Sequence, residues 1–334
     1  MIATRQLIVY VTPLLLLQLA VIVGPALLNI GFAFTQWRGF DRPVFNGIEN
    51  FERLFADSVF WLALGHNIQW TLFFLTVPIF MALVGAFLVS RLRRGQMIFR
   101  ILYFIPYIVA PTVNAEIWRY ILNPLHGIGA QLERHLGWGW ANVGFFTDRD
   151  LVLWSIANVD NWHWWGFLFV LYLTAMQSVS RDLYDAAKVD GATAWEQFRH
   201  VTVPGIRPTL FYTLMITLSG SFLIFDYVWI LTEGGPARGS EVLGSYMYKQ
   251  AIYGFEMGYS AAIALGMTLR ALMGEMMGKA TGACHGKGGS MHMTDASIGL
   301  LGANAIVGAQ LPIALGAADR TSQKDRHHCR DLFR

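Results

Sequence analysis

Long apolar stretches separated by polar segments run through most of the chain. Five of them reach the roughly 20 residues that a helix needs to cross a bilayer core of about 30 Å. They cover residues 7–34, 61–89, 98–122, 152–179 and 209–231. The pattern therefore predicts an all-α polytopic membrane protein with five complete transmembrane helices.

A sixth apolar stretch begins near Phe255 but ends at Leu269, because charged residues such as Arg270 and Glu275 follow it. At about 1.5 Å of rise per residue, this stretch covers roughly 22 Å, which is too short to cross the bilayer core. We therefore expect a truncated sixth helix, followed by a short irregular soluble tail. Completing the span with residues 270–278 would cost about 2.5–3.5 kcal/mol for each charge at the bilayer centre.

Composition supports a membrane protein, and the basic residues indicate its orientation. Of the 334 residues 54% are hydrophobic and 14% are charged, whereas a soluble domain has about 25% charged residues. Loops 90–97 and 180–208 are rich in Arg and Lys, while the alternate loops mix acidic and basic residues. Because cytoplasmic loops carry the excess of basic residues, we predict a cytoplasmic N-terminus and place both basic loops inside. The small net charge of +3 gives no indication of a nucleic-acid partner.

Loop 180–208 has the pattern of two short helices joined by a tight turn. Asp182 can cap the first helix, and the sequence "TAWE" fits a capping box that begins the second. Gly191 supplies the turn, where a side chain would be strained, and Pro204 and Pro208 are expected to end the second helix. Two interpretations are open from the pattern alone: a docking element for a cytosolic partner, or an amphipathic hairpin lying on the bilayer surface.

The sequence "LYDAAKVDGATAWEQFRHVTVPGIRPTL" closely resembles the EAA-loop signature of ABC-importer permeases of the carbohydrate-uptake type. Asp185 stands where glutamate is usual, and Val203 stands where leucine is usual. "LTEGGP" at 231–236 and "GYSAAIA" at 258–264 also resemble this family, so the likeness covers roughly residues 1–268. The resemblance implies a permease subunit that passes a sugar, polyol or glycerol phosphate across a bacterial inner membrane by alternating access.

In that family the loop is the coupling helix, which lies in a cleft of the cytosolic ATPase subunit. The resemblance therefore implies an ATPase-coupling role for Asp185, Ala186, Ala187, Asp190, Gly191, Ala192, Phe198 and Pro204. It also implies a second permease subunit and an extracytoplasmic solute-binding protein as partners. The sequence contains no GxxxxGK[ST] phosphate loop, so we assign ATP and Mg²⁺ to the partner. We expect this chain to bind no cofactor or metal and to catalyse no reaction.

Ionisable side chains within spans are energetically costly and are candidates for function. Three carboxylates from three predicted spans lie within about eight residues of the outer end, a depth of roughly 12 Å or less. With two aromatic neighbours they form the predicted substrate-lining set: Glu116, Asp160, Trp162, Asp226 and Tyr227. The alternatives are an ion pair of Glu116 with Arg119 and an interfacial aromatic belt that includes Trp162. The sequence does not separate a monosaccharide, a disaccharide, a polyol and glycerol phosphate.

The C-terminal part differs in character from the apolar stretches. "GKGGSMHM" at 286–293 and "AIVGAQLP" at 305–312 resemble the N-terminal part of the alpha subunit of thiamine-pyrophosphate-dependent 2-oxoacid (pyruvate or acetoin) dehydrogenases. That family holds its diphosphate through Mg²⁺ at a Gly-Asp-Gly…Asn stretch further along, which this sequence lacks. The resemblance therefore implies an incomplete thiamine pyrophosphate site and no dehydrogenase activity.

These observations divide the chain into a permease region 1–269, a dehydrogenase-like fragment 270–318 and a patternless segment 319–334, such as a shifted reading frame would produce. Three hypotheses are open. The chain is a working importer subunit, a nonfunctional permease–dehydrogenase fusion (real or due to an assembly error), or a membrane-anchored thiamine pyrophosphate enzyme fragment. The missing metal motif counts against the third hypothesis.

Overall fold

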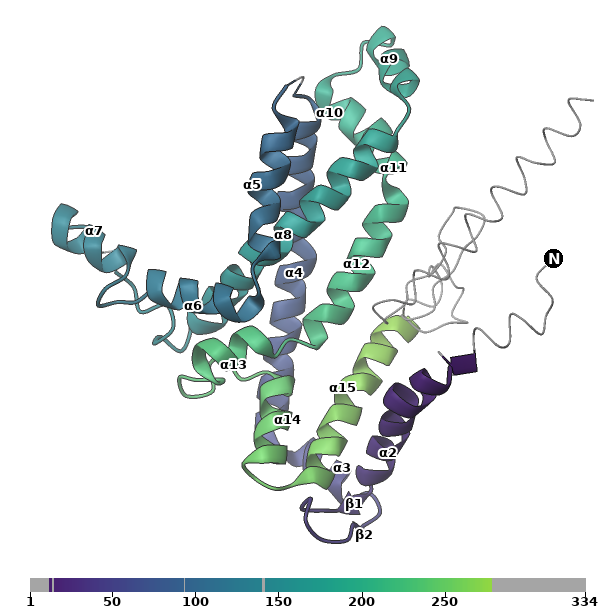
Figure 1. The fold of residues 1–334 in the computed structure, drawn as a ribbon, viewed down its shortest axis with the longest axis vertical. Helices are drawn as coiled ribbons and strands as arrows, with labels where there is room; N and C mark the ends of the chain where they lie inside the picture. Colours follow the sequence, from purple (N-terminus) through teal and green to yellow (C-terminus); the bar gives the residue numbers. More distant parts are fainter. Residues whose placement is uncertain (1–11, 14, 93, 140–141, 278–334) are drawn as a thin grey trace, which may run out of the picture.

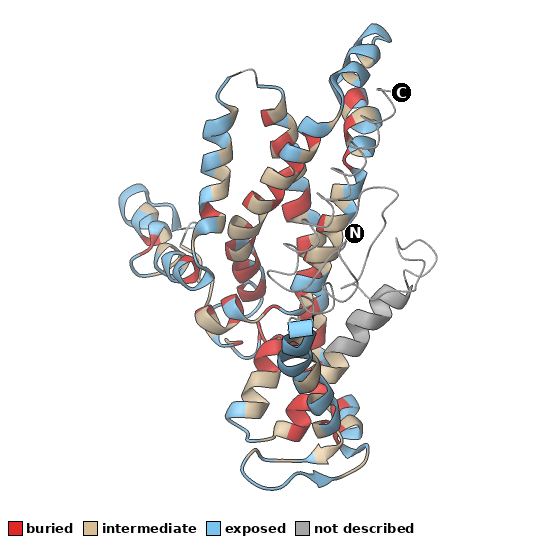
Figure 2. Cartoon of the chain, turned by 45° about the vertical axis from the view of Figure 1, so that its right-hand side comes forward, coloured by how far each residue is buried: buried red, intermediate tan, exposed pale blue. Residues whose placement is uncertain are grey.

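The computed structural model describes residues 12–13, 15–92, 94–139 and 142–277, with side chains up to residue 267. The described chain is mainly helical, with long helices lying side by side (Figure 1). The central helix is α4 (Ser58–Ser90), which packs along α8 (Val152–Ser178), α5 (Gln96–Ile108) and α12 (Arg207–Phe222). Buried residues gather where these helices face one another, as Figure 2 shows.

The remaining elements connect or flank this bundle. They are η1 (Leu19–Val23), α2 (Gly24–Phe32), β1 (Thr35–Gln36), β2 (Val44–Phe45), α3 (Glu49–Ala56), α6 (Pro111–Ile121), α7 (Ile128–Leu136), α9 (Arg181–Val189), α10 (Ala194–Gln197), η3 (Phe198–Thr202), α11 (Val203–Gly205), α13 (Asp226–Thr232), α14 (Leu243–Ile252) and α15 (Met257–Met277). The two short strands pair antiparallel, with Thr35 opposite Phe45. Helices α6 and α7 form an arm that projects from the bundle (Figure 1).

The expected count of five complete spans is not confirmed. Within the described residues, two stretches are helices long and apolar enough to cross a membrane, Leu15–Phe32 and Ser58–Ser90. They coincide with the first two predicted spans. Helix α8 has 27 residues, but polar residues such as Asp160 and Asn161 in its first half leave it outside that count. Two further spans are possible only if each of two bent helix pairs is counted as one.

The stretches 98–122 and 209–231 are therefore not the continuous helices that we expected. The first divides into α5 and α6, which are bent by 96°, and the second into α12 and α13, bent by 42°. At the first break Val109 and Ala110 have extended backbone before Pro111, because proline disfavours the helical conformation of the residue that precedes it. A count of apolar residues does not register such a break.

Helix α15 runs past the point at which the sequence predicts its end. Its backbone is helical over 21 residues, from Met257 to Met277, so the expected end at Leu269 is wrong. At about 1.5 Å per residue this helix is roughly 32 Å long, enough to cross a bilayer core. The predicted tail segments from residue 278 onward lie outside the described residues.

A polar clasp joins the beginning of α15 to α3, α4 and α14 at the lower end of the bundle in Figure 1. Asp57, the N-cap of α4, accepts hydrogen bonds from the hydroxyl of Tyr246 and, at 2.6 Å, from that of Tyr259. Arg53 pairs with Glu256 at 2.6 Å and lies over the Tyr259 ring at 4.0 Å. The clasp fixes the N-terminal end of α15 against the central helix.

Candidate functional site

Two places in the fold gather the predicted functional residues: the loop between α8 and α12, and a cavity where α12 breaks. In the loop, α9 begins at Ser180, whose hydroxyl accepts from the Asp182 backbone N–H at 3.3 Å. Our prediction that Asp182 caps this helix is therefore wrong. Asp182 lies in the first turn instead, where its negative charge favours the helix dipole.

The turn between α9 and α10 has the predicted geometry. Gly191 has a φ of +76°, a left-handed conformation that L-residues with a side chain adopt only with strain. The capping box is also confirmed: the Glu196 N–H donates to the Thr193 hydroxyl at 3.4 Å, and the Thr193 N–H donates to the Glu196 carboxylate at 2.7 Å. The Thr193 hydroxyl also donates to the Glu196 carboxylate at 2.7 Å, and this hydrogen bond, together with the one from the Thr193 N–H, holds the pKa of Glu196 below its ordinary value. Local hydrogen bonds thus define the loop without a partner.

Pro204 does not end the second helix of the loop, contrary to the prediction. The chain stays helical from α10 through the π-helical segment η3 into α11, and Pro204 lies in the first turn of α11. Proline is tolerated in the first turn of a helix, because its missing N–H would have no partner within that helix. The helical path is interrupted only at Ile206, immediately before α12.

The loop exposes most of the predicted coupling residues. Leu183, Val189 and Trp195 are apolar yet 55%, 88% and 64% exposed. Asp185 is also exposed and pairs with Lys188 at 2.7 Å, and the hydrogen bond from that ammonium holds the pKa of Asp185 below its ordinary value. Asp190, Gly191, Ala186 and Pro204 are exposed, and Ala187 and Ala192 are partly buried.

Phe198 differs from the other predicted coupling residues because it faces the bundle. Its ring lies 4.7 Å from that of Phe87 on α4 and 5.4 Å from that of Trp195. Arg91, at the C-terminal end of α4, donates to the Ala194 carbonyl at 3.3 Å. Phe198 and Arg91 therefore connect the exposed loop mechanically to the central helix.

A cavity of about 240 Å³ opens where α12 breaks before α13. Polar side chains from three helices line it: Asp160 and His163 of α8, Thr217 and Ser221 of α12, and Asp226 and Tyr227 of α13. Aromatic side chains from α4 and α8 complete its wall: Trp70, Phe74 and Trp164. The cavity thus combines carboxylates, hydroxyls and aromatic rings.

Hydrogen bonds organise part of the cavity wall. The Asn114 amide, fully buried on α6, donates to the Tyr227 hydroxyl at 2.9 Å. The side-chain oxygen of Asn114 has no hydrogen-bond partner among the described residues. The Trp164 indole N–H donates to the Thr217 hydroxyl at 3.3 Å. Asn114 is not among the residues that line the cavity, so it acts on the wall only through its hydrogen bond to the Tyr227 hydroxyl.

The structure brings together three of the five predicted substrate-lining residues. Asp160, Asp226 and Tyr227 lie on the cavity, and their role in binding stays a prediction. Glu116 lies elsewhere on α6, where its carboxylate is 57% exposed and pairs with Arg119 at 3.2 Å. Trp162 is not among the lining residues, and its ring packs edge-on against Trp118 at 5.7 Å. The alternative of a Glu116–Arg119 pair is the geometry observed.

Sequence reasoning missed Asn114, His163 and Trp70. Asn114 and Trp70 lie on helices distant in sequence from Asp226, and only the packing of α4 and α6 brings them near. His163 could have been found, because it lies three residues after Asp160 and therefore on the same side of α8.

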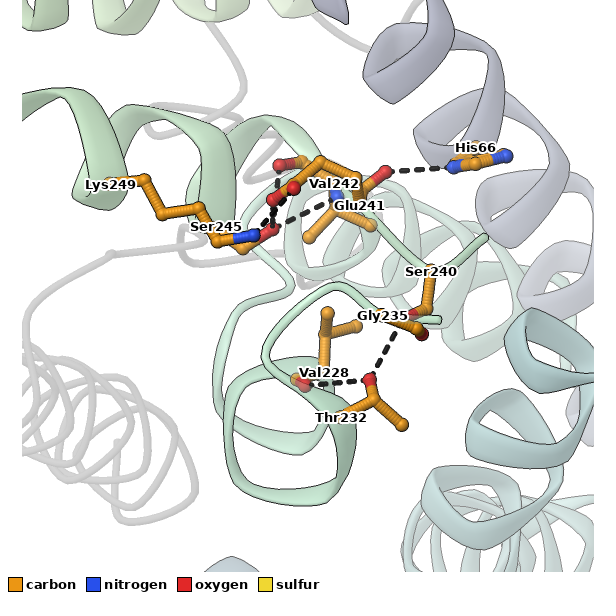
Figure 3. Close-up of polar contacts among 9 residues, drawn as sticks. All are labelled: His66, Val228, Thr232, Gly235, Ser240, Glu241, Val242, Ser245 and Lys249. Atoms are coloured by element: carbon orange, nitrogen blue, oxygen red, sulfur yellow. Dashed lines mark hydrogen bonds and ion pairs between the residues drawn. The ribbon is translucent and has the colours of Figure 1, made fainter. Parts of the chain in front are cut away.

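The wall formed by the α12–α13 break is held by Asn67, a fully buried residue of α4. Its amide nitrogen donates to the carbonyl of Phe222, the last residue of α12, at 3.3 Å. Its oxygen accepts from the N–H of Leu243, the first residue of α14, at 2.8 Å. The neighbouring His66 makes a 2.8 Å hydrogen bond with the Glu241 carbonyl (Figure 3). Helix α4 thus ties together both ends of the segment that carries Asp226.

The "LTEGGP" segment lies against the Glu241 side chain at Gly234, and Figure 3 shows this side chain directed toward Ser245 and Lys249 of α14. This carboxylate is 2% exposed; it accepts from Lys249 at 2.6 Å and from the Ser245 hydroxyl at 2.6 Å. Gly234 has a φ of +85°, and a Cβ there would lie 2.8 Å from the carboxylate. Thr232, at the end of α13, contacts the Ser240 hydroxyl at 2.8 Å. The loop therefore requires glycine at 234.

Among the described residues, no group of three or more His, Cys, Asp or Glu side chains could hold a metal ion. The histidines and cysteine at 284, 285 and 292 lie outside that part of the chain.

Comparison with known proteins identifies the class of this membrane protein. The family model for binding-protein-dependent transport system inner membrane components matches residues 7–277. The chain belongs to this family and is a permease subunit of an ABC importer. A probable ABC transporter permease, YurN of Bacillus subtilis, is 33% identical over 258 residues, which cover 76% of this chain and 88% of YurN.

A second relative and a solved structure agree with this assignment. The probable starch degradation products transport system permease AmyD of Thermoanaerobacterium thermosulfurigenes is 31% identical over 265 residues, which cover 78% of this chain and 88% of AmyD. A bacterial ABC transporter involved in import of the acidic polysaccharide alginate has the same fold, with a TM-score of 0.71 at 22% identity, over 83% of this chain and 96% of that one.

The C-terminal segment has a separate likeness. The model for the dehydrogenase E1 component matches residues 256–329, so the two family matches overlap on residues 256–277, which are Glu256 and the whole of α15. The resemblance of the tail to such dehydrogenases is therefore found by comparison as well.

Proposed function

We propose that this permease imports a carbohydrate of the sugar, polyol or glycerol-phosphate class by alternating access, with loop 180–208 as its contact with a cytosolic ATPase subunit. The name of AmyD, a transport system for starch degradation products, supports the carbohydrate class. The cavity at the α12–α13 break supports it as well, because carboxylates, hydroxyls and aromatic rings are the groups that recognise sugar hydroxyls and sugar ring faces.

The observation that carries the coupling role is the preformed geometry of the loop. Gly191 and the Thr193–Glu196 capping box define it locally, and its apolar tip residues are exposed to solvent. An exposed Val189 and Trp195 next to small alanines suit a partner that approaches closely. Phe198 and Arg91 connect the loop to α4, which lines the cavity through Trp70 and Phe74. Movement of the loop would therefore reach the cavity wall.

The proposal includes the remaining predicted partners and the orientation. A second permease subunit and an extracytoplasmic binding protein complete the importer, and the family description itself names binding-protein dependence. The N-terminus and loop 180–208 lie on the cytosolic side. We infer that region 1–269 carries this function and that the dehydrogenase-like fragment 270–318 contributes no activity. A nonfunctional fusion is the competing hypothesis.

Gly191→Val tests the coupling role. A β-branched residue in the left-handed conformation costs about 1–2 kcal/mol and shifts the turn between α9 and α10. We expect ATP-driven sugar uptake by the complete importer to be lost while the permease still inserts into the membrane. The matched control is Gly137→Val, because Gly137 also has a positive φ, +70°, and an added Cβ meets no atom within 4 Å at either glycine.

Uptake by the Gly137→Val importer should stay near that of the unmodified importer. Uptake unchanged in the Gly191→Val importer would remove the coupling role from the loop. If the unmodified complex, with its ATPase subunits and binding protein, takes up no sugar or polyol at all, the chain is a nonfunctional fusion.

A further inference from the structure

We propose that the cavity at the α12–α13 break selects its solute by charge: it admits neutral or amino sugars and polyols, and it excludes acidic sugars and sugar phosphates. This inference rests on the proposed function, because it concerns the same cavity. It narrows the substrate class that the sequence leaves open by removing glycerol phosphate and other anionic solutes.

The charges that line the cavity have one sign. Asp160 comes from α8 and Asp226 from the start of α13, so carboxylates approach the cavity from two different helices. No lysine or arginine is present among the residues that the structure places on its wall. Arg119, on α6, is occupied by Glu116 and by the carbonyl of Ile230. An anionic solute would therefore meet two carboxylates and no fixed cation on the wall, where His163 is the one basic side chain.

Hydrogen-bond chemistry leads to the same selection. Carboxylate oxygens of Asp160 and Asp226, on the cavity wall, accept hydrogen bonds. The indole N–H of Trp164 already donates to Thr217. The Tyr227 hydroxyl accepts from Asn114 and so keeps its own proton to donate, but the two carboxylates give the wall an excess of acceptors, which favours a solute that donates. Sugar hydroxyls and ammonium groups donate, whereas carboxylates and phosphates of acidic sugars only accept.

The inference separates this chain from a protein of the same fold. The solved structure similar to it belongs to an importer of alginate, an acidic polysaccharide. Fold similarity alone would suggest an acidic substrate for this chain as well. The carboxylates on the cavity wall argue for the opposite charge preference, because the side chains at the site and not the fold decide binding.

Charged thiol reagents test the proposal without knowledge of the natural solute. In the full importer complex, Cys284 and Cys329 are replaced by serine, and Ser221→Cys places one thiol on the cavity wall. Three methanethiosulfonates modify it during ATP turnover: the cationic aminoethyl, the anionic sulfonatoethyl and the small neutral methyl reagent. Val44→Cys, at a 63% exposed position of β2, corrects for the intrinsic reactivity of each reagent.

We expect the cationic reagent to modify position 221 faster than the anionic reagent by on the order of tenfold after this correction. The double variant Asp160→Asn with Asp226→Asn, in the same background, should bring the ratio close to one. Equal rates for both charges, or a ratio that the double variant does not change, would overturn the proposal. So would a failure of all three reagents, because a solute site must open during turnover.

Uptake assays keep this proposal separate from the proposed function. The complete importer is offered galactose with galacturonate, glucose with glucuronate, and glycerol with glycerol 3-phosphate, each pair being a neutral solute and its acidic derivative. Uptake of an acidic member over its neutral partner would overturn charge selection and leave the carbohydrate importer intact. Coupling through the loop stands or falls on Gly191→Val alone, which does not touch the cavity.

Discussion

The ion pair of Glu241 and Lys249 allows a quantitative prediction of unfolding free energies, because its two side chains are buried to different degrees. The Glu241 carboxylate is 2% exposed, while the Lys249 side chain is 32% exposed, and their atoms are 2.6 Å apart. Lys249→Met removes the cation and leaves a charge that water cannot reach. Breaking a buried ion pair in this way costs about 3–5 kcal/mol.

Glu241→Gln should cost less than Lys249→Met. The amide keeps the shape of the side chain and can still accept from Ser245, while the Lys249 ammonium, one-third exposed, is rehydrated. We expect a loss of about 1–2 kcal/mol for this variant, the net value of a hydrogen bond to a charged group. The double variant should cost less than the sum of the single variants, with a coupling free energy of about 2 kcal/mol.

The assay is equilibrium unfolding of the purified permease in mixed detergent micelles, followed by tryptophan fluorescence, for a full double-mutant cycle. The matched control is Glu256→Gln, because the Arg53–Glu256 pair has the same 2.6 Å separation but side chains that are 50% and 38% exposed. That variant should lose less than about 1 kcal/mol. Equal costs for the two single variants at the buried pair, with no coupling between them, would refute the reasoning from burial.

Two further predictions concern the contacts around α4. Partial burial raises the pKa of Asp57, but hydrogen bonds from Tyr246, Tyr259 and the Val59 N–H outweigh it and hold that pKa below its ordinary value. The clasp should therefore stabilise the protein fully above about pH 4, and this stabilisation should be lost as pH falls through the depressed pKa of Asp57. Melting temperatures measured between pH 3 and 7 should show this loss. An Asp57→Asn protein whose melting temperature falls with pH in the same way would contradict the assignment to Asp57. Asn67→Leu leaves a buried N–H and a buried carbonyl without partners, which should cost about 2–5 kcal/mol. A thermal shift for Asn67→Leu no larger than that for an exposed Glu52→Gln would show that Asn67 is not a clamp.

The sequence predicted those features that local chemistry determines. The capping box at Thr193 and the turn at Gly191 each depend on residues within a few positions of one another, and both have the expected geometry. The central helix α4 was expected because its apolar run is long and contains only one proline. Competition between neighbouring caps was not resolved, since Ser180 and Asp182 are both good capping residues.

Features that depend on packing were missed or misplaced. Apolar residues continue across the break between α12 and α13, and the side chain that satisfies the freed carbonyl, Asn67, lies some 150 residues earlier. Asp160 lies on the cavity, whereas Glu116 is exposed and pairs with Arg119. This difference depends on which face of each helix packs against neighbouring helices. Nothing in the sequence around Glu241 indicates that this charged loop residue is almost fully buried, with a side chain that is 2% exposed.

The continuous backbone of α15 has a consequence for how proteins can be joined. The helix runs without interruption over Met257–Met277, where likeness to the transport family gives way to likeness to the dehydrogenase family. A helix backbone needs only residues of adequate propensity, and "RALMGEMM" consists of good helix formers apart from one glycine, which costs about 1 kcal/mol. Recombination inside a helix therefore conserves its hydrogen-bond ladder even when every later side chain has a different ancestry. A junction between Glu241 and Lys249, by contrast, would leave the buried Glu241 carboxylate without its ion-pair partner and would destabilise the protein.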